Sequence, residues 1–211
     1  MGKIIERLDL RKQLEQYYTA AAAPAIIDVP AMQFLMIDGH GDPNTSPDYA
    51  AAVAALFSVS FTLKFGFQRG HTPIDYPVMP LEALWRADDP ASFRNGDKSK
   101  WFWTVMIMQP DIVTKPLVEA AIAMASGKKP NAMLDHLQFA TYKEGRSAQL
   151  LHIGPYSAEG PNIEALHAFI AAQGGRLTCR HHEIYLSDPR RTAPENLKTI
   201  IRQPFALRDE A

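Results

Sequence analysis

The chain has 211 residues, of which 46% are hydrophobic and 21% are charged, and its formal net charge at pH 7 is −1. This composition is typical of a folded globular protein and lacks the basic excess of nucleic-acid-binding domains. The single cysteine, Cys179, excludes an internal disulfide and favours a reducing, cytoplasmic setting. The charged N-terminal residues predict no secretion signal, and no apolar run approaches the ~18 residues that span a bilayer. We therefore expect a soluble protein that binds neither nucleic acid nor membranes.

The first part of the chain is predicted to be an N-terminal helical arm over residues 1–30. Asp9 can cap a helix that Pro24 would end. An apolar run over 32–37 then indicates a strand, and a long helix is expected from Pro47. One face of this helix is lined at helical spacing by Tyr49, Val53, Leu56, Phe57, Ser60 and Leu63, and Gly66 and Gly70 lie at its end.

Two further strands are predicted before the middle of the chain. Residues 78–87 indicate one strand. Residues 101–110 are apolar on both faces, which is typical of a central strand in a sheet. A helix over 115–125 then leads into the second half.

The second half is predicted to repeat this order of elements. Strands are expected over 138–142 and 148–153, followed by a helix over 160–175 that stops at two glycines. Further strands are expected over 181–189 and 198–205.

An internal repeat is indicated by this order and by three matched positions. The pairs are Ile37 with Ile153, Glu82 with Glu183, and Gln109 with Gln203. The first unit would span about 31–112, a linking helix about 113–130, and the second unit about 135–205. Two half-sheets related in this way would leave a cleft between them, where ligands commonly bind.

Glu183 lies in the middle of the predicted strand HHEIYLSDP. Alternation of side chains places Cys179, His181, Glu183 and Tyr185 on one face. Three interpretations of this carboxylate stay open. It could pair with a lysine or arginine, or ligate a metal with Cys179 and His181, although three ligands on one strand converge poorly and we expect no metal site. It could also be a buried carboxylate with a raised pKa, facing an aromatic pocket that attracts cations.

Several segments together resemble the GyrI-like small-molecule-binding family. They are VPAMQFLMIDGHGDPN, VMPLEALW, WFWTVMIMQPD, LLHIGPYSAEGP and HHEIYLSDPRRTAPENLKTIIRQP. The match is with the stand-alone subgroup, which lacks a DNA-binding domain, and runs from about residue 3 to residue 205. The resemblance implies an α+β fold over residues 31–211. Its tandem pseudo-symmetric strand-helix-strand-strand units would have antiparallel sheets, helices on one side and a central ligand groove.

A subset of these stand-alone proteins, the cyclopropanoid cyclopropyl hydrolases, resembles this chain more closely still. Its members open the cyclopropane of DNA-alkylating natural products inside an aromatic cage. The resemblance implies binding of aromatic or cationic hydrophobic xenobiotics, with hydrolysis and non-catalytic sequestration as alternatives. Glu183 would anchor the ligand or deprotonate water, and Tyr185 or Tyr156 would donate a hydrogen bond. The candidate ligand-binding residues are Trp101, Trp103, Tyr156, Glu82, Phe57, Phe61 and Trp85.

Four positions depart from this expected pattern, and two of them, Ala83 and Arg86, stand where a glycine and a second aromatic residue are usual. Phe57 and Phe61 stand where close relatives are expected to carry tyrosines, which puts turnover in doubt more than binding. Related tandem folds also resemble heme-binding proteins, and His152 and His167 are the axial ligands that this less favoured alternative would use. We otherwise expect no cofactor, a small-molecule ligand as partner, and a monomer or homodimer.

Overall fold

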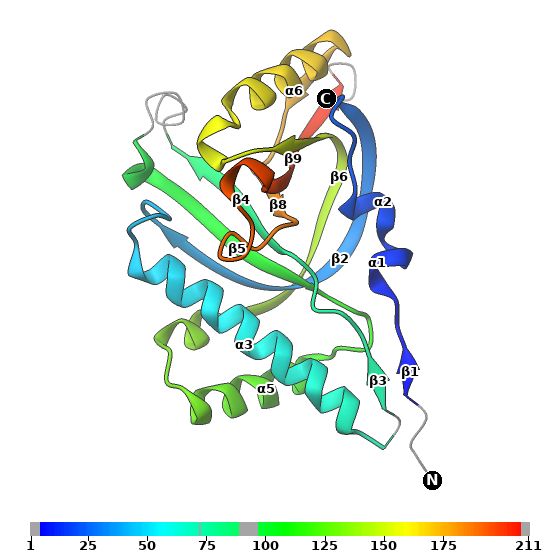
Figure 1. The fold of residues 1–211 in the computed structure, drawn as a ribbon, viewed down its shortest axis with the longest axis vertical. Helices are drawn as coiled ribbons and strands as arrows, with labels where there is room; N and C mark the ends of the chain where they lie inside the picture. Colours follow the sequence, from blue (N-terminus) through cyan, green and yellow to red (C-terminus); the bar gives the residue numbers. More distant parts are fainter. Residues whose placement is uncertain (1–4, 72, 89–96, 208–211) are drawn as a thin grey trace. The chain divides into compact units, whose positions relative to one another are not determined.

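The computed structural model describes residues 5–71, 73–88 and 97–207, which fold into two compact units (Figure 1). The first unit contains Met1–Leu14, Met32–Met79 and Ala87–Tyr142, and the second contains Glu15–Ala31, Pro80–Arg86 and Lys143–Ala211. Each unit combines antiparallel strands with helices, so the predicted α+β class is confirmed. The predicted division into an arm and two tandem halves rests on the repeat and stays a prediction.

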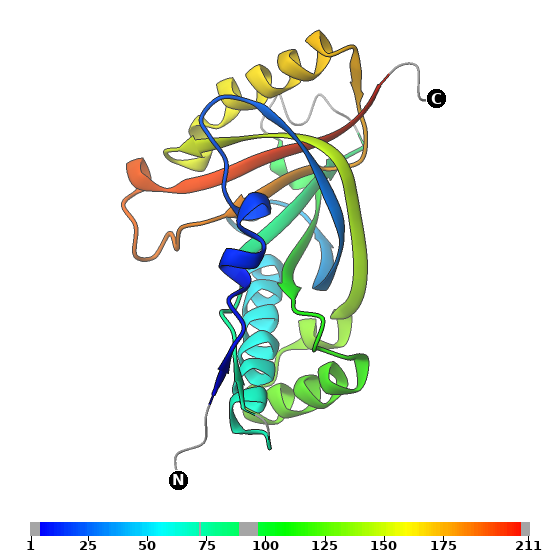
Figure 2. The same ribbon diagram turned by 90° about the vertical axis from the view of Figure 1, so that its right-hand side faces the viewer.

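The first unit is built on one antiparallel strand pair and two helices. Strand β2 (Ala25–His40) pairs with β5 (Trp101–Gln109) in a register that sets Gln33 opposite Gln109 and His40 opposite Phe102. Helix α3 (Pro47–Arg69) packs on β5 and on α5 (Lys115–Lys128), and Figure 2 shows the two helices side by side. The short strands β1 (Glu6–Arg7) and β3 (Ile74–Asp75) form a separate parallel pair in this unit.

Helix α3 is capped by Ser46 at its N-terminus and by Gly70 at its C-terminus. The Ser46 side chain accepts a hydrogen bond from the Tyr49 backbone N–H, and Pro47 fits the first turn because its missing N–H needs no partner there. Gly70 ends the helix, whereas Gly66 lies inside it. By length and composition α3 is also a candidate membrane span in the described part of the chain. It packs on β5 and α5 with seven buried residues, as a core helix does.

The second unit is an antiparallel sheet with one helix on it. Its strands are β4 (Leu81–Ala87), β6 (Gln138–Ile153) from Lys143 onward, β7 (Gly175–Leu177), β8 (His181–Tyr185) and β9 (Lys198–Leu207). Strand β8 pairs with β4 on one side and β9 on the other, while β6 and β7 also pair with β9. Helix α6 (Gly160–Ala172) covers one face through a core of Ala148, Leu150, Leu166, Ile170, Ile201 and Phe205.

Short elements complete the described chain. They are α1 (Leu10–Gln13), α2 (Glu15–Tyr18), η1 (Lys98–Lys100), η2 (Ala132–His136), η3 (Tyr156–Ala158) and η4 (Pro194–Asn196). In chain order, β2, α3, β4 and β5 are followed by β6, α6, β8 and β9, so the strand-helix-strand-strand order does occur twice, with short elements inserted.

Three predicted elements differ from the structure. Asp9 does cap a helix, but Leu14 interrupts the expected single helix and leaves two one-turn pieces. The strand expected over 32–37 begins at Ala25. The two strands expected around 138–153 are one continuous strand, in which Gly145 adopts a positive φ of 74° that other residues rarely accept.

Candidate functional site

Strand β8 presents two chemically different faces. His182 and Ile184 are buried, whereas His181, Glu183 and Tyr185 are partly accessible, which confirms the predicted alternation. The β4–β8 register sets Trp85 opposite His181 and Ala83 opposite Glu183. Directly paired residues share a face of a sheet, so Trp85 lies on the Glu183 face.

Glu183 bridges a phenol and an imidazole. The Tyr185 Oη donates a hydrogen bond of 2.7 Å to Glu183 Oε2, and His181 Nε2 lies 3.4 Å from Glu183 Oε1. Burial raises the pKa of Glu183, but His181, the Tyr185 hydroxyl and the Trp85 side chain outweigh it and the net pKa is lowered. The carboxylate is therefore ionised at neutral pH although its side chain is only 13% exposed.

These contacts decide between the interpretations of Glu183. The expectation of a raised pKa is wrong, because hydrogen bonds stabilise the charged form. Its nearest partners are His181 and Tyr185 rather than a lysine or arginine. Among the described residues no group of three metal-ligating side chains is present, and Cys179 is exposed.

Tyr156 forms an aromatic wall beside Tyr185. Their ring centroids lie 5.5 Å apart in an edge-to-face arrangement, and Tyr156 is 38% exposed. Burial, together with the nearby carboxylates of Glu159, Glu183 and Asp188, raises the pKa of Tyr156 to about 12. Negative potential beside tyrosine rings is an environment that attracts a cation.

His152 holds the loop that carries Tyr156. Its Nε2 lies 3.2 Å from the Pro155 carbonyl oxygen, and Asn162 Nδ2 lies 2.9 Å from its Nδ1. Both ring nitrogens are therefore occupied by protein atoms, so His152 has no free nitrogen to serve as the axial heme ligand that we considered. His167 is the other ligand that this alternative would use, and its Nε2 makes no hydrogen bond within the described residues.

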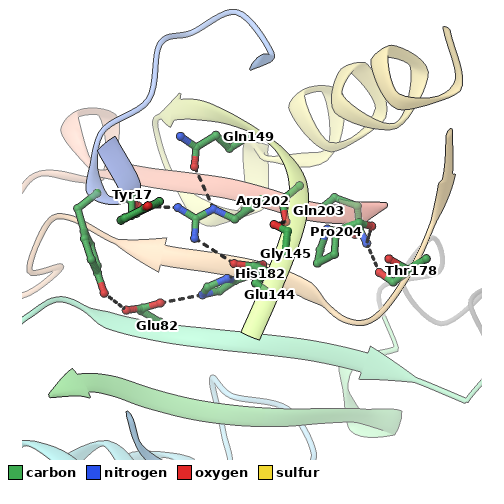
Figure 3. Close-up of polar contacts among 12 residues, drawn as sticks. Tyr17, Glu82, Glu144, Gly145, Gln149, Thr178, His182, Arg202, Gln203 and Pro204 are labelled. Carbon is green, nitrogen blue, oxygen red and sulfur yellow. Dashed lines mark hydrogen bonds and ion pairs between the residues drawn. The ribbon is translucent and has the colours of Figure 1, made fainter. Parts of the chain in front are cut away.

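A network of charged side chains is buried on the opposite face of β8 (Figure 3). His182 lies between two carboxylates, 3.0 Å from Glu82 Oε2 and 2.9 Å from Glu144 Oε1. Arg202 donates to Glu144 at 3.0 Å, and the Tyr18 hydroxyl donates to Glu82 at 2.6 Å. Two cationic groups thus face two carboxylates, as burial of charge requires.

The pKa values of this network follow from its pairing. Burial lowers the pKa of His182, but Glu144 and Glu82 raise it to about 9. Burial raises the pKa of Glu144, but His182 and Arg202 lower it to about 2. Glu82, one of the candidate ligand-binding residues, contacts His182 and the Tyr18 hydroxyl in this buried network.

The other expected ligand-binding aromatics lie in the first unit. Phe57 and Phe61 stack with centroids 6.3 Å apart, and Phe61 also stacks on Phe65 at 5.9 Å. Trp103 is buried against Tyr49, with ring centroids 5.2 Å apart. Lys98 Nζ lies 5.3 Å from the ring centroid of Trp101. Participation of Trp101, Trp103, Phe57 and Phe61 in a ligand site stays a prediction.

Sequence reasoning missed most of the buried network. Alternation along β8 predicts that His182 lies on the other face of the strand from Glu183. Glu144 and Arg202 are 58 positions apart and meet through the long-range pairing of β6 with β9. No local pattern indicated that contact.

Residues 22–205 match the model of a family described as the GyrI-like small molecule binding domain. The chain is 36% identical to an uncharacterized conserved protein from Listeria innocua, with a TM-score of 0.87 and 94% of this chain and 100% of that chain covered. It is 35% identical to a hydrolase from Listeria innocua, with a TM-score of 0.83 and the same coverage.

More distant comparison shows the fold alone. The EcmrR C-terminal domain is 10% identical, with a TM-score of 0.55 and 87% of this chain and 97% of that chain covered. No protein of curated function matches the chain. The cytoplasmic location and the monomeric or homodimeric state stay predictions.

Proposed function

Because the chain belongs to the GyrI-like family of small-molecule-binding domains, we propose that the Glu183 face of β8 binds hydrophobic ligands that carry positive charge or aromatic rings. The observation that carries this proposal is an ionised, largely buried carboxylate beside tyrosine rings. A cation that reaches Glu183 gains a charge-assisted contact in a partly dehydrated setting, and each favourable ring adds ~0.5–2 kcal/mol. Foreign organic cations are the ligand class that fits both features.

Binding can be measured with tetraphenylphosphonium, a permanent aromatic cation whose charge does not depend on pH. Glu183→Gln keeps the shape of the side chain and removes its charge. We expect this variant to bind at least about tenfold more weakly, a change of about 1.4 kcal/mol. Glu195→Gln, which removes an exposed charge from the same unit, is the matched control and should bind like the wild type. Equal affinity of wild type and Glu183→Gln would overturn the proposal.

A second candidate function, hydrolysis of a cyclopropane ring, is favoured by the Tyr185–Glu183 hydrogen bond and by the hydrolase among the relatives. In this reaction the oxygen of water bonds to a ring carbon while one strained carbon–carbon bond breaks. The released electron pair moves to the carbonyl oxygen of the activated substrate, where a tyrosine hydroxyl can donate a hydrogen bond. The water proton leaves to a base, and the product contains the substrate plus one water.

Hydrolysis is tested with a cyclopropane-bearing DNA-alkylating compound and mass spectrometry. The expected result is catalytic gain of one water that depends on both Glu183 and Tyr185. Tyr185→Phe removes only the hydroxyl and should slow turnover about 10²-fold or more if that group assists as a positioned acid. A rise in melting temperature with ligand, but no added water, would identify the protein as a sequestering binder.

A further inference from the structure

His181 is a titratable group on the Glu183 face that has no assigned role. Its side chain is 13% exposed, and in the described structure neither ring nitrogen makes a hydrogen bond of good geometry, although Nε2 lies 3.4 Å from Glu183 Oε1. Buried polar atoms are nearly always bonded to protein or water. Because Nε2 faces Glu183, Nδ1 is the ring nitrogen that is left for an atom from outside the described residues.

The groups that surround His181 come from its own strand β8, from β4 and from α6. On β8 itself it faces Glu183, and its register partner on β4 is Trp85, which does not titrate. On α6 it faces His167, whose pKa is lowered by burial and then by the charge of His181. Gln203 on β9 hydrogen-bonds to His167 and carries no charge. The Nε2 of His167 also makes no hydrogen bond within the described residues.

His182, the adjacent histidine, points to the other face of β8 and has different partners. Both ring nitrogens of His182 contact carboxylates, Glu82 and Glu144, on the opposite face. Of these two adjacent histidines, it is His181 that combines a contact to Glu183 with a ring nitrogen left for a ligand or water.

We propose that His181 is the proton acceptor of this site, with Glu183 orienting its ring through Nε2 and leaving Nδ1 free to take a proton from water. This inference rests on the proposed function. A carboxylate with a lowered pKa is a weak base, whereas a neutral imidazole is the strongest side-chain base that stays uncharged near pH 7. A carboxylate that orients an imidazole is also the arrangement that hydrolytic triads use.

The proposal gives hydrolysis a balanced proton path. Nδ1 of His181 takes one proton from water as the water oxygen bonds to the strained ring carbon. The electron pair of the broken carbon–carbon bond ends on the substrate oxygen, to which the Tyr185 hydroxyl donates once it releases its hydrogen bond to Glu183. That oxygen then receives a proton from solvent, and His181 returns its own proton to solvent.

The first test does not require turnover. Protonation of His181 places a positive charge 3.4 Å from Glu183, so binding of tetraphenylphosphonium should weaken as the pH falls. For the wild type we expect the Kd to rise about tenfold between pH 8 and pH 5, the range in which histidine titrates. His181→Gln should give a nearly flat profile over this pH range. A profile of His181→Gln that follows the wild type would overturn the proposal.

Two variants separate this role from folding and from the neighbouring histidine. His181→Asn is a second neutral replacement and should repeat the flat profile, with melting temperatures recorded for both variants. His167→Gln should keep the pH dependence, because His181 remains beside Glu183. If His167→Gln alone flattens the profile, the proton resides on His167 and the assignment to His181 is wrong.

The second test uses the cyclopropane-bearing compound. If the wild type adds water to it, His181→Gln should lower kcat by about 10²–10⁴-fold with little change in KM. Unchanged kcat would overturn the proposal, and if the wild type adds no water the binding profile alone decides. Failure of the proposed function is distinguishable, because it appears as unchanged cation affinity in Glu183→Gln. A loss of affinity in Glu183→Gln together with a wild-type pH profile in His181→Gln rejects only the role of His181.

Discussion

Glu82 and Glu183 lie on adjacent strands but on opposite faces of the sheet, because the register pairs Glu82 with Ile184 and Glu183 with Ala83. The two glutamates that the predicted repeat matches therefore have different environments. Glu82 is buried between Tyr18 and His182, whereas Glu183 contacts Tyr185 and His181 on the partly accessible face. One glutamate is suited to stability and the other to a ligand.

This division predicts different effects of the same substitution at the two positions. Glu82→Gln leaves His182 with one carboxylate fewer in a buried site, so we expect a loss of about 3 kcal/mol in the free energy of unfolding. Glu183→Gln should cost about 1 kcal/mol, the net value of one hydrogen bond, and should mainly weaken cation binding. Urea unfolding and binding of tetraphenylphosphonium measure the two effects. A larger loss of stability in Glu183→Gln than in Glu82→Gln would contradict this division.

The buried network also predicts how stability depends on pH. The pKa of His182 rises from 6.5 to about 9 on folding, so its contribution is fully present below pH 6.5 and is lost as the pH rises through 9. The pKa of Glu144 falls from 4.5 to about 2, so its contribution is present above pH 4.5 and is lost as the pH falls through 2. Unfolding by urea should therefore show a stability plateau between about pH 5 and pH 6.5.

His182→Gln is the variant that checks the alkaline side of this profile. It should be less stable than the wild type at pH 6, and the difference between the two proteins should shrink as the pH approaches 10. A difference that stays constant from pH 6 to pH 10 would show that His182 is not charged in the folded state.

The loop that carries Tyr156 gives a third prediction. His152→Phe removes the contacts to Pro155 and Asn162 but keeps a ring in the buried position. We expect Tyr156 to lose its fixed edge-to-face contact with Tyr185 and cation affinity to fall several-fold, within the range of one cation–π contact. Tyr156→Leu measures the full contribution of that ring, and adding His152→Phe to it should cause no further loss of affinity. Additive losses would show that His152 acts by another route.

Sequence reasoning predicted what depends on local pattern and missed what depends on long-range pairing. Alternation along β8 predicted that Glu183 and Tyr185 share one face. The order strand, helix, strand, strand was predicted for each half of the chain. The bridge from Glu144 to Arg202 requires β6 to lie beside β9, a pairing that no window of sequence reveals. The lowered pKa of Glu183 was missed for a similar reason, because the shift depends on the position of the neighbouring His181 ring, which no sequence pattern predicts.

A close backbone approach in the first unit gives the last prediction. Gly39 pairs with Trp103 across β2 and β5, and a Cβ atom at Gly39 would overlap the Trp103 indole ring. Trp103 is buried and also packs against Tyr49, so its ring has little freedom to move aside. Gly39→Ala should therefore destabilise the protein by about 1–3 kcal/mol, as overpacked cores do.

Gly41→Ala is unsuitable as a control because Gly41 has a φ of 97°, whereas Gly127→Ala meets no atoms within 4 Å and should be neutral or slightly stabilising. In a double mutant, Trp103→Leu should recover part of the stability lost in Gly39→Ala, because the smaller side chain leaves room for the added methyl group. If the two losses simply add, the overlap with Trp103 is not the cause.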